Sequence, residues 1–139
     1  MLRILALCVA AATVLGATAA HGQGRLTPDQ QYLAAREAYA KGNAAALATH
    51  ARALKGHILE PYAEFWQLRL RLEQAAPGEV SDFLGRYTGS LVAEQLRREW
   101  LLLLGKRQQW ELFDAAFPNL VLDDPDANCY SLLRRELNP

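Results

Sequence analysis

The histidines His50 and His57 are the first candidates for chemistry, because an imidazole binds metals and exchanges protons near neutral pH. Their separation is close to two helical turns, which would place both rings on one face of a continuous helix. Gly56 directly precedes His57 and interrupts such a helix. We therefore interpret the pair as solvated residues near a helix end, and the sequence predicts no metal site and no cofactor.

The acidic run DDPDAN, residues 123–128, is a candidate for calcium binding. An EF-hand loop that started at Asp124 would find oxygen ligands at its first, third and fifth positions. The same loop needs Gly where Cys129 stands and a bidentate Glu where Arg135 stands. We interpret the run instead as an N-cap at Asp124, followed by a helix that Pro125 opens.

Paired carboxylates would be the candidates for acid–base chemistry on a glycosidic bond. Glu94 and Glu99 flank the basic pair Arg97-Arg98, and ordinary ion pairing on a helix surface explains all four residues. The sequence also has no recognisable Ser-His-Asp order, phosphate-binding Gly loop or CxxC motif. We therefore predict no catalytic residue in this chain.

Arg69 is the one residue for which we predict a contact with a substrate or a partner. On a helix, it falls between Phe65 and Trp66, in the middle of an apolar arc. Its stem could pack on the aromatic rings while the guanidinium meets a carboxylate from a neighbouring helix. Alternatively, the arc lines a concave surface where Arg69 binds a ligand carboxylate, or the residue is simply exposed.

The elements that position these residues begin with two capped helices. Thr27 is an N-cap, Pro28 occupies the first helical position, and Gln30 completes a capping box. Gly42 ends this first helix, and Asn43 caps the second.

Apolar residues at helical spacing predict five further helices. They cover residues 59–75, 80–87, 91–104, 110–117 and a stretch from 125 onward. The predicted breaks between them are Pro77-Gly78, Gly89-Ser90, Gly105 and Pro118. No stretch alternates as a strand does, so the expected fold class is all-α.

The odd-numbered helices start near residues 28, 60 and 90, a period of about 30 residues with short connections within each pair. This spacing predicts stacked antiparallel helix hairpins that form a partial α-solenoid. The ordered signature of a tetratricopeptide repeat does not recur, so we expect a degenerate relative of that repeat. A compact helical bundle is the alternative.

The N-terminus indicates export. Arg3 precedes an uncharged apolar run over residues 4–17, and Ala-Thr-Ala at 17–19 matches a cleavage site. We predict a signal peptide over residues 1–22 and one α-superhelical domain over 23–139. The apolar run is shorter than the roughly 20 residues of a spanning helix, and an uncleaved anchor is the alternative.

The charge balance and the cysteine content limit the classes of molecule that the chain is expected to bind. The chain carries 15 basic and 15 acidic side chains, which directs it neither to nucleic acid nor to an anionic membrane. After signal removal only Cys129 remains, and we expect its partner on a second chain or on a further segment.

Four segments together resemble the N-terminal portion of the soluble lytic murein transglycosylases of Gram-negative bacteria. They are residues 32–42, 57–72 (HILEPYAEFWQLRLRL), 83–110 and 117–132, of which Leu-Glu-Pro-Tyr and Leu-Gly-Lys-Arg-x-x-Trp are the most specific parts. The resemblance implies a periplasmic, ring- or U-shaped superhelix that contacts peptidoglycan or a periplasmic protein. It also implies that residues 23–139 are a truncated part of that superhelix, or that the enzyme was split.

In this family a separate lysozyme-like domain cleaves the bond between N-acetylmuramic acid and N-acetylglucosamine and leaves a 1,6-anhydro product, without a metal. The catalytic Glu-Ser pair and the Gly-Leu-Met-Gln stretch of that domain do not occur here. The resemblance therefore implies a scaffold segment without activity of its own. A stand-alone periplasmic adaptor that binds a protein partner is the alternative.

Overall fold

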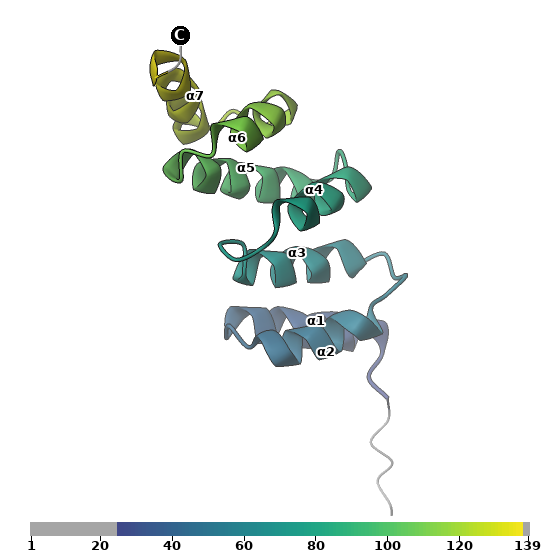
Figure 1. Ribbon diagram of the computed structural model, residues 1–139. Coiled ribbons are helices and arrows are strands. Elements are labelled where there is room, and N and C mark those ends of the chain that lie inside the picture. Colours follow the sequence, from purple (N-terminus) through teal and green to yellow (C-terminus); the bar gives the residue numbers. More distant parts are fainter. Residues whose placement is uncertain (1–24, 138–139) are drawn as a thin grey trace, which may run out of the picture.

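The chain is all-helical over residues 25–137, the part that the computed structural model describes (Figure 1). Its elements are α1 (Pro28–Ala40), α2 (Ala44–Ala53), α3 (Glu60–Leu70), α4 (Pro77–Arg86), α5 (Leu91–Lys106), α6 (Trp110–Ala116), a 3-10 turn (Phe117–Asn119) and α7 (Pro125–Leu137). None of the helices in this range is long and apolar enough to cross a membrane. The predicted signal peptide, residues 1–22, lies outside the described residues.

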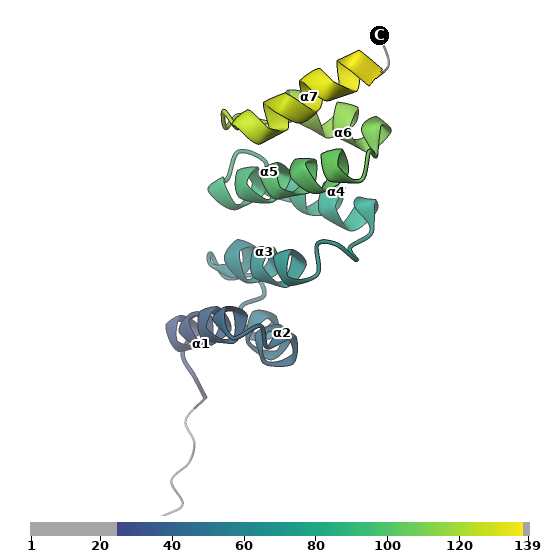
Figure 2. The same ribbon diagram turned by 90° about the vertical axis from the view of Figure 1, so that its left-hand side faces the viewer.

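The helices lie one above another in chain order, from α1 and α2 at one end to α7 at the other (Figure 1). The odd-numbered helices contact one another in succession, α1 with α3, α3 with α5, and α5 with α7. Helix α2 packs against α1 and α3, and both α4 and α6 pack against α5. Seen from the side, the odd-numbered helices form one column and the even-numbered helices lie beside it (Figure 2).

The predicted caps of the first helices are confirmed. The Thr27 hydroxyl accepts a hydrogen bond from Gln30 N, and the Gln30 amide oxygen accepts one from Thr27 N. The side-chain oxygens of Asn43 and Ser90 cap α2 and α5 by accepting hydrogen bonds from Ala46 N and Ala93 N. Gly42 adopts a φ of 65° between α1 and α2, a left-handed conformation that a side chain would disfavour.

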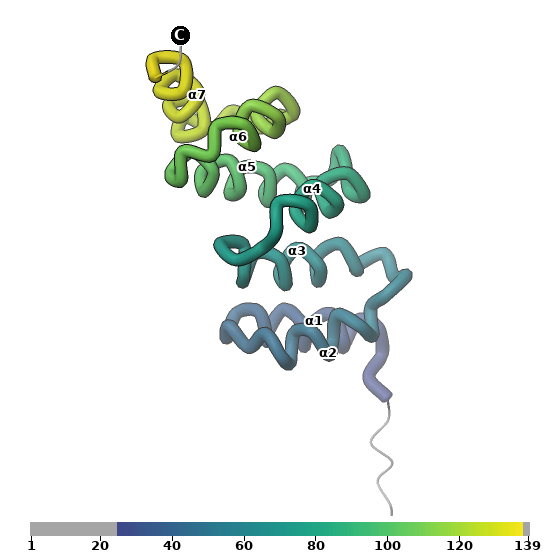
Figure 3. The backbone as a smooth tube through the Cα atoms, in the orientation of Figure 1, coloured from purple at the N-terminus to yellow at the C-terminus, as the bar shows by residue number. Residues whose placement is uncertain are grey.

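Helix α3 is shorter than predicted. It ends at Leu70, and residues 71–75 leave the helix as a turn that leads to α4 (Figure 3). The Arg71 guanidinium donates to both Glu79 oxygens in α4, at 2.9 and 2.8 Å. This contact between α4 and the residue after α3 stabilises the turn. The apolar periodicity of residues 59–75 does not reflect it and therefore predicts too late an end for the helix. Pro77 opens α4 as its first residue.

Gly105 does not break a helix, contrary to the prediction. Helix α5 runs through it to Lys106, and the left-handed residue that follows is Gln108, with a φ of 54°. A Cβ atom at position 105 would lie 2.3 Å from Cγ of Tyr130 in α7. The glycine is therefore a packing residue that lets the Tyr130 ring lie directly on the α5 backbone.

The core runs through the whole stack and changes character along it. Between α1, α2 and α3 it consists of alanines, leucines and aromatic rings in contact with one another. The Trp66 ring lies 5.6 Å from the Tyr39 ring and 5.3 Å from the Tyr32 ring, between centroids. Between α4, α5 and α6 the largest fully buried side chains are Phe83, Leu96, Leu101, Leu104 and Phe113.

Candidate functional site

Arg69 lies at the exposed edge of α3 and is paired with Glu99 of α5. Its Nε donates to one Glu99 oxygen at 2.8 Å, and its Nη2 lies 2.7 Å from the other. The guanidinium carbon also lies 5.7 Å from the centroid of the Phe65 ring. The predicted contact with an aromatic ring and with a carboxylate from a neighbouring helix is thus confirmed. However, 43% of the Arg69 side chain is exposed, so it does not lie in the middle of a buried arc.

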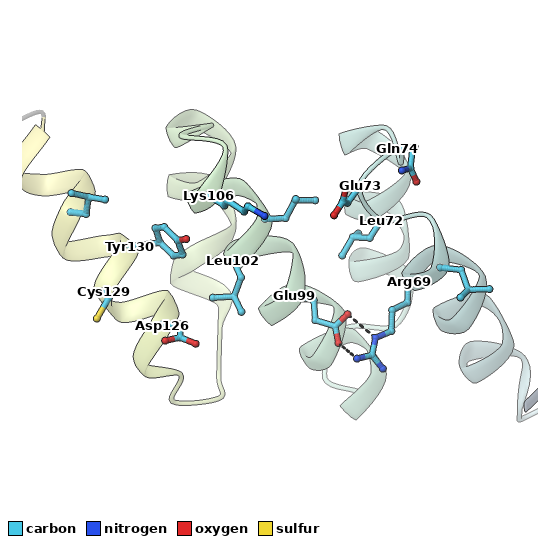
Figure 4. A pocket seen from close by; sticks show the side chains of 13 residues that line it. Arg69, Leu72, Glu73, Gln74, Glu99, Leu102, Lys106, Asp126, Cys129 and Tyr130 are labelled. Carbon is cyan, nitrogen blue, oxygen red and sulfur yellow. Dashed lines mark hydrogen bonds and ion pairs between the residues drawn. The ribbon is translucent and has the colours of Figure 1, made fainter. Parts of the chain in front are cut away.

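This ion pair lies at one end of a groove of about 780 Å³ along the column of odd-numbered helices (Figure 4). The groove lies between the end of α3, the following turn, α5 and α7. Its apolar lining residues are Leu70, Leu72, Leu102, Leu103, Tyr130 and Leu133, and its polar ones are Arg69, Glu73, Gln74, Glu99, Lys106, Asp126 and Cys129.

Charges of both signs surround the groove. Lys106 and Glu73 face each other across it in the close view (Figure 4). Glu73 also lies 4.0 Å from the Arg107 guanidinium, whereas Lys106 has no acidic partner among residues 25–137. A ligand with both acidic and basic groups on an apolar body would match this lining. Glu99 is held by Arg69 at 2.7 Å and is not placed against a second carboxylate.

Cys129 lies at the same groove, on the exposed side of α7, as a free thiol. Its predicted partner is not among the described residues, and Cys8 lies outside them.

The two histidines make hydrogen bonds with different partners. His50 Nδ1 lies 2.7 Å from the Gln31 side-chain oxygen, which ties α2 to α1. His57 lies in the turn after α2, where its Nδ1 accepts a hydrogen bond from Leu59 N at 3.3 Å. Within residues 25–137 no group of three or more His, Cys, Asp or Glu side chains is arranged to hold a metal ion.

Asp124 is the N-cap of α7, as predicted. One carboxylate oxygen accepts a hydrogen bond from Ala127 N at 2.8 Å, and the other accepts one from Arg98 Nε of α5. The hydrogen bond from Ala127 N, and then the Arg98 guanidinium, hold the Asp124 pKa below its usual value. Asp124 is 5% exposed, so a buried carboxylate joins α7 to α5.

The interpretation of Glu94 and Arg97 as surface residues is wrong. Both are buried, and Arg97 Nε donates to one Glu94 oxygen at 3.3 Å. The second Glu94 oxygen accepts a hydrogen bond from Val121 N at 2.9 Å, in the segment that leads to α7. A signal was present in the sequence, because Arg97 continues the helical stripe that includes the buried residues Ala93 and Leu101.

Comparisons of the chain with protein-family models, with curated proteins and with solved structures found no significant match.

Proposed function

We propose that this chain is a non-catalytic helical scaffold of the periplasmic cell-wall machinery, the N-terminal portion of a lytic transglycosylase. In this proposal, the helices are the stacked hairpins of a partial, degenerate tetratricopeptide-like solenoid. The four sequence segments named above support the family. The succession of contacts between odd-numbered helices supports the architecture.

The groove between α3, α5 and α7 is the observation that carries the binding function. Peptidoglycan peptides carry both carboxylates and amino groups, and the groove offers Lys106, Arg69 and acidic side chains around an apolar floor. Arg69 uses only part of its five-donor guanidinium on Glu99, so it retains N–H groups for a ligand carboxylate. No metal or cofactor takes part in this function.

A periplasmic adaptor that binds a protein partner is the second candidate. The exposed leucines of the groove favour it, since Leu70 and Leu133 are 38% and 43% exposed. Apolar groups of this kind commonly mark a protein-binding surface when they are contiguous.

Sedimentation with purified sacculi tests the proposal, with two leucines of α7 as a matched pair. Leu133 lines the groove and Leu132 does not, although they are 43% and 54% exposed on the same helix. We expect the wild-type chain to be retained, Leu133→Glu to weaken retention at least about tenfold, and Leu132→Glu to leave it unchanged. Absence of retention, or equal effects of both substitutions, would refute peptidoglycan binding in the groove. A protein captured in periplasmic extract by wild type and Leu132→Glu, but not by Leu133→Glu, would then favour the adaptor.

The same sacculi test the absence of catalysis. The loss of a general acid alone removes a factor of about 10²–10⁴ in rate, and the family's catalytic motifs do not occur in this sequence. We expect no release of 1,6-anhydromuropeptides by the purified chain. Release at the rate of an intact enzyme would contradict the scaffold assignment.

A further inference from the structure

A second, smaller cavity of about 290 Å³ lies between α4, α5 and α6 and shares no lining residue with the groove. Its buried lining consists of Leu84, Arg97, Trp100 and Ala116. Thr88 and Asn119 are exposed lining residues that bring polar atoms to its rim. Arg97 is therefore the one charged residue in the lining, and the other lining residues are apolar or uncharged polar ones.

Arg97 is unusual because it is 8% exposed and yet only partly satisfied. Its Nε donates to Glu94, which fixes the plane of the guanidinium. Within residues 25–137 neither Nη1 nor Nη2 has a hydrogen-bond acceptor. Both atoms are partly accessible to solvent. Among residues 25–137, a Glu64 oxygen is the one fully buried side-chain nitrogen or oxygen atom that lacks a hydrogen bond. Arg97 thus lines the cavity with a side chain whose two N–H₂ groups have no acceptor among residues 25–137.

A buried charge with unused donors is costly unless an acceptor completes it. The edge of the guanidinium formed by Nη1 and Nη2 matches the two oxygens of a carboxylate. We propose that this cavity binds the carboxylate of a small aliphatic N-acyl amino acid, as found at the C-terminus of a peptide, with Arg97 as the carboxylate-binding residue. This site is independent of the function proposed for the groove.

The remaining lining accounts for the other parts of this ligand. Leu84, Ala116 and Trp100 form an apolar wall for a small aliphatic side chain, and the volume leaves little room for a larger one. At the rim the Thr88 hydroxyl already donates to the carbonyl oxygens of Leu84 and Gly85, so its oxygen is left as an acceptor. Such an acceptor suits the N–H group next to the carboxylate of an acylated amino acid.

The three tryptophans provide the readout, because Trp100 lines the cavity and Trp66 and Trp110 do not. In an NMR titration with N-acetylalanine, we expect a saturable shift of the Trp100 indole N–H signal and unchanged Trp66 and Trp110 signals. N-acetylalaninamide, which lacks the carboxylate, should bind at least about tenfold more weakly. Equal binding of acid and amide, equal shifts of all three indoles, or no shift with the acid would overturn the proposal.

A comparison with trialanine identifies the source of the carboxylate. Binding as tight as, or tighter than, that of N-acetylalanine supports a peptide terminus as the ligand. Exclusion of trialanine, while N-acetylalanine still binds, supports a free small acid.

Two glycines of α4 give a matched pair of variants that leaves the Glu94–Arg97 pair intact. Gly85 lines the cavity and Gly78 does not, and a Cβ atom at either position meets no heavy atom within 4 Å. We expect Gly85→Leu to fill the cavity and to weaken N-acetylalanine binding at least about tenfold, with unchanged Trp66 and Trp110 signals. Gly78→Leu should bind like wild type. Wild-type affinity in Gly85→Leu, or an equal loss in Gly78→Leu, would overturn the assignment of the site.

Discussion

The helices α1 to α3 and the helices α5 to α7 are held together by different forces. In the first group, the helices are joined by close alanine packing and by the Trp66 ring, which is stacked on Tyr39 and tilted against Tyr32. In the second group, charged side chains make the junctions as well. Asp124 joins α7 to Arg98 of α5, and Glu94 holds both Arg97 and the backbone of Val121.

The difference matters because apolar packing tolerates adjustment and directional contacts do not. Removal of a methyl group from a layer of aromatic rings or alanines lowers stability by the lost burial of that group and by the small cavity that it leaves. A carboxylate lost from a buried junction leaves donors without acceptors, which costs more. Single substitutions should therefore separate the two regions, and α7, which forms one wall of the groove, should be the more sensitive element.

The largest expected effect comes from Asp124→Ala. This change removes the cap of α7 and the partner of Arg98, and because Arg98 is 40% exposed it partly regains water. We expect a loss of about 2–3 kcal/mol in the free energy of unfolding, measured by urea denaturation. Thr27→Ala, which removes an exposed cap in the aromatic region, is the control and should cost about 1 kcal/mol. Equal losses in the two variants would remove the contrast between the regions.

Gly105→Ala should come next. The new methyl group would lie 2.3 Å from the base of the Tyr130 ring, so α7 must shift away from α5. We expect a loss of about 2 kcal/mol by denaturation. Gly85→Ala places the same group in open space on a helix and should instead stabilise the protein by about 0.5–1 kcal/mol. Tyr130→Ala should lower the free energy of unfolding less in the Gly105→Ala variant than in the wild-type chain, because the clash has already displaced the ring. Equal losses in the two backgrounds would contradict a direct contact between residues 105 and 130.

Arg69→Met should have a smaller effect. It retains the apolar stem over Phe65 and removes the partner of Glu99, whose side chain is 23% exposed. Solvent screens this pair, so we expect a loss of about 1 kcal/mol by denaturation. Lys41→Met, at the highly exposed pair with Glu37, should leave stability unchanged. An unchanged free energy of unfolding in Arg69→Met would mean that the Arg69–Glu99 pair does not hold α3 on α5.

The smallest effect concerns the pair that ends α3. The hydrogen bonds from Arg71, and then from Ala76 N, lower the pKa of Glu79 to about 2. Because this carboxyl has a lower pKa in the folded chain, its stabilisation is present above the unfolded pKa of about 4.3 and is lost as the pH falls through about 2. In Arg71→Gln the Glu79 pKa should rise towards its ordinary value, as followed by carboxyl NMR titration. An unchanged pKa would exclude Arg71 as its main cause.

The features that were predictable from the sequence are those that neighbouring residues determine. The caps at Thr27, Asn43 and Asp124 each need only a side-chain oxygen and the next three residues. The end of α3 depends on Glu79, which is eight positions from Arg71, and so apolar periodicity could not place it. A glycine such as Gly105 is typical of a helix end. Its actual role, to make room for the Tyr130 ring, depends on the packing of α7 against α5.

The candidate sites show the same limit. Helical phase identified Arg69 as a charge beside aromatic residues, and physical reasoning required a carboxylate partner for it. Nothing local indicated that Glu99 would be that carboxylate, since the two residues are 30 positions apart. An i, i+3 pair such as Glu94 and Arg97 has the same sequence pattern whether it is buried or exposed, so only the stripe that Arg97 shares with Ala93 and Leu101 could have indicated its burial.

Native-state hydrogen exchange at pH 5.5 and pH 2.5 tests most directly the claim that α7 is held by charge and α1 to α3 by apolar packing. The lowered pKa of Asp124 means that its stabilisation is present above about pH 4 and is lost as the pH falls through the folded pKa. We predict that protection factors in α7 fall much more between the two pH values than those in α1 and α3. In Asp124→Asn, which can still cap the helix, α7 protection should be lower at pH 5.5 and nearly independent of pH. A uniform loss of protection across all helices, or a pH dependence of α7 that persists in Asp124→Asn, would contradict the claim.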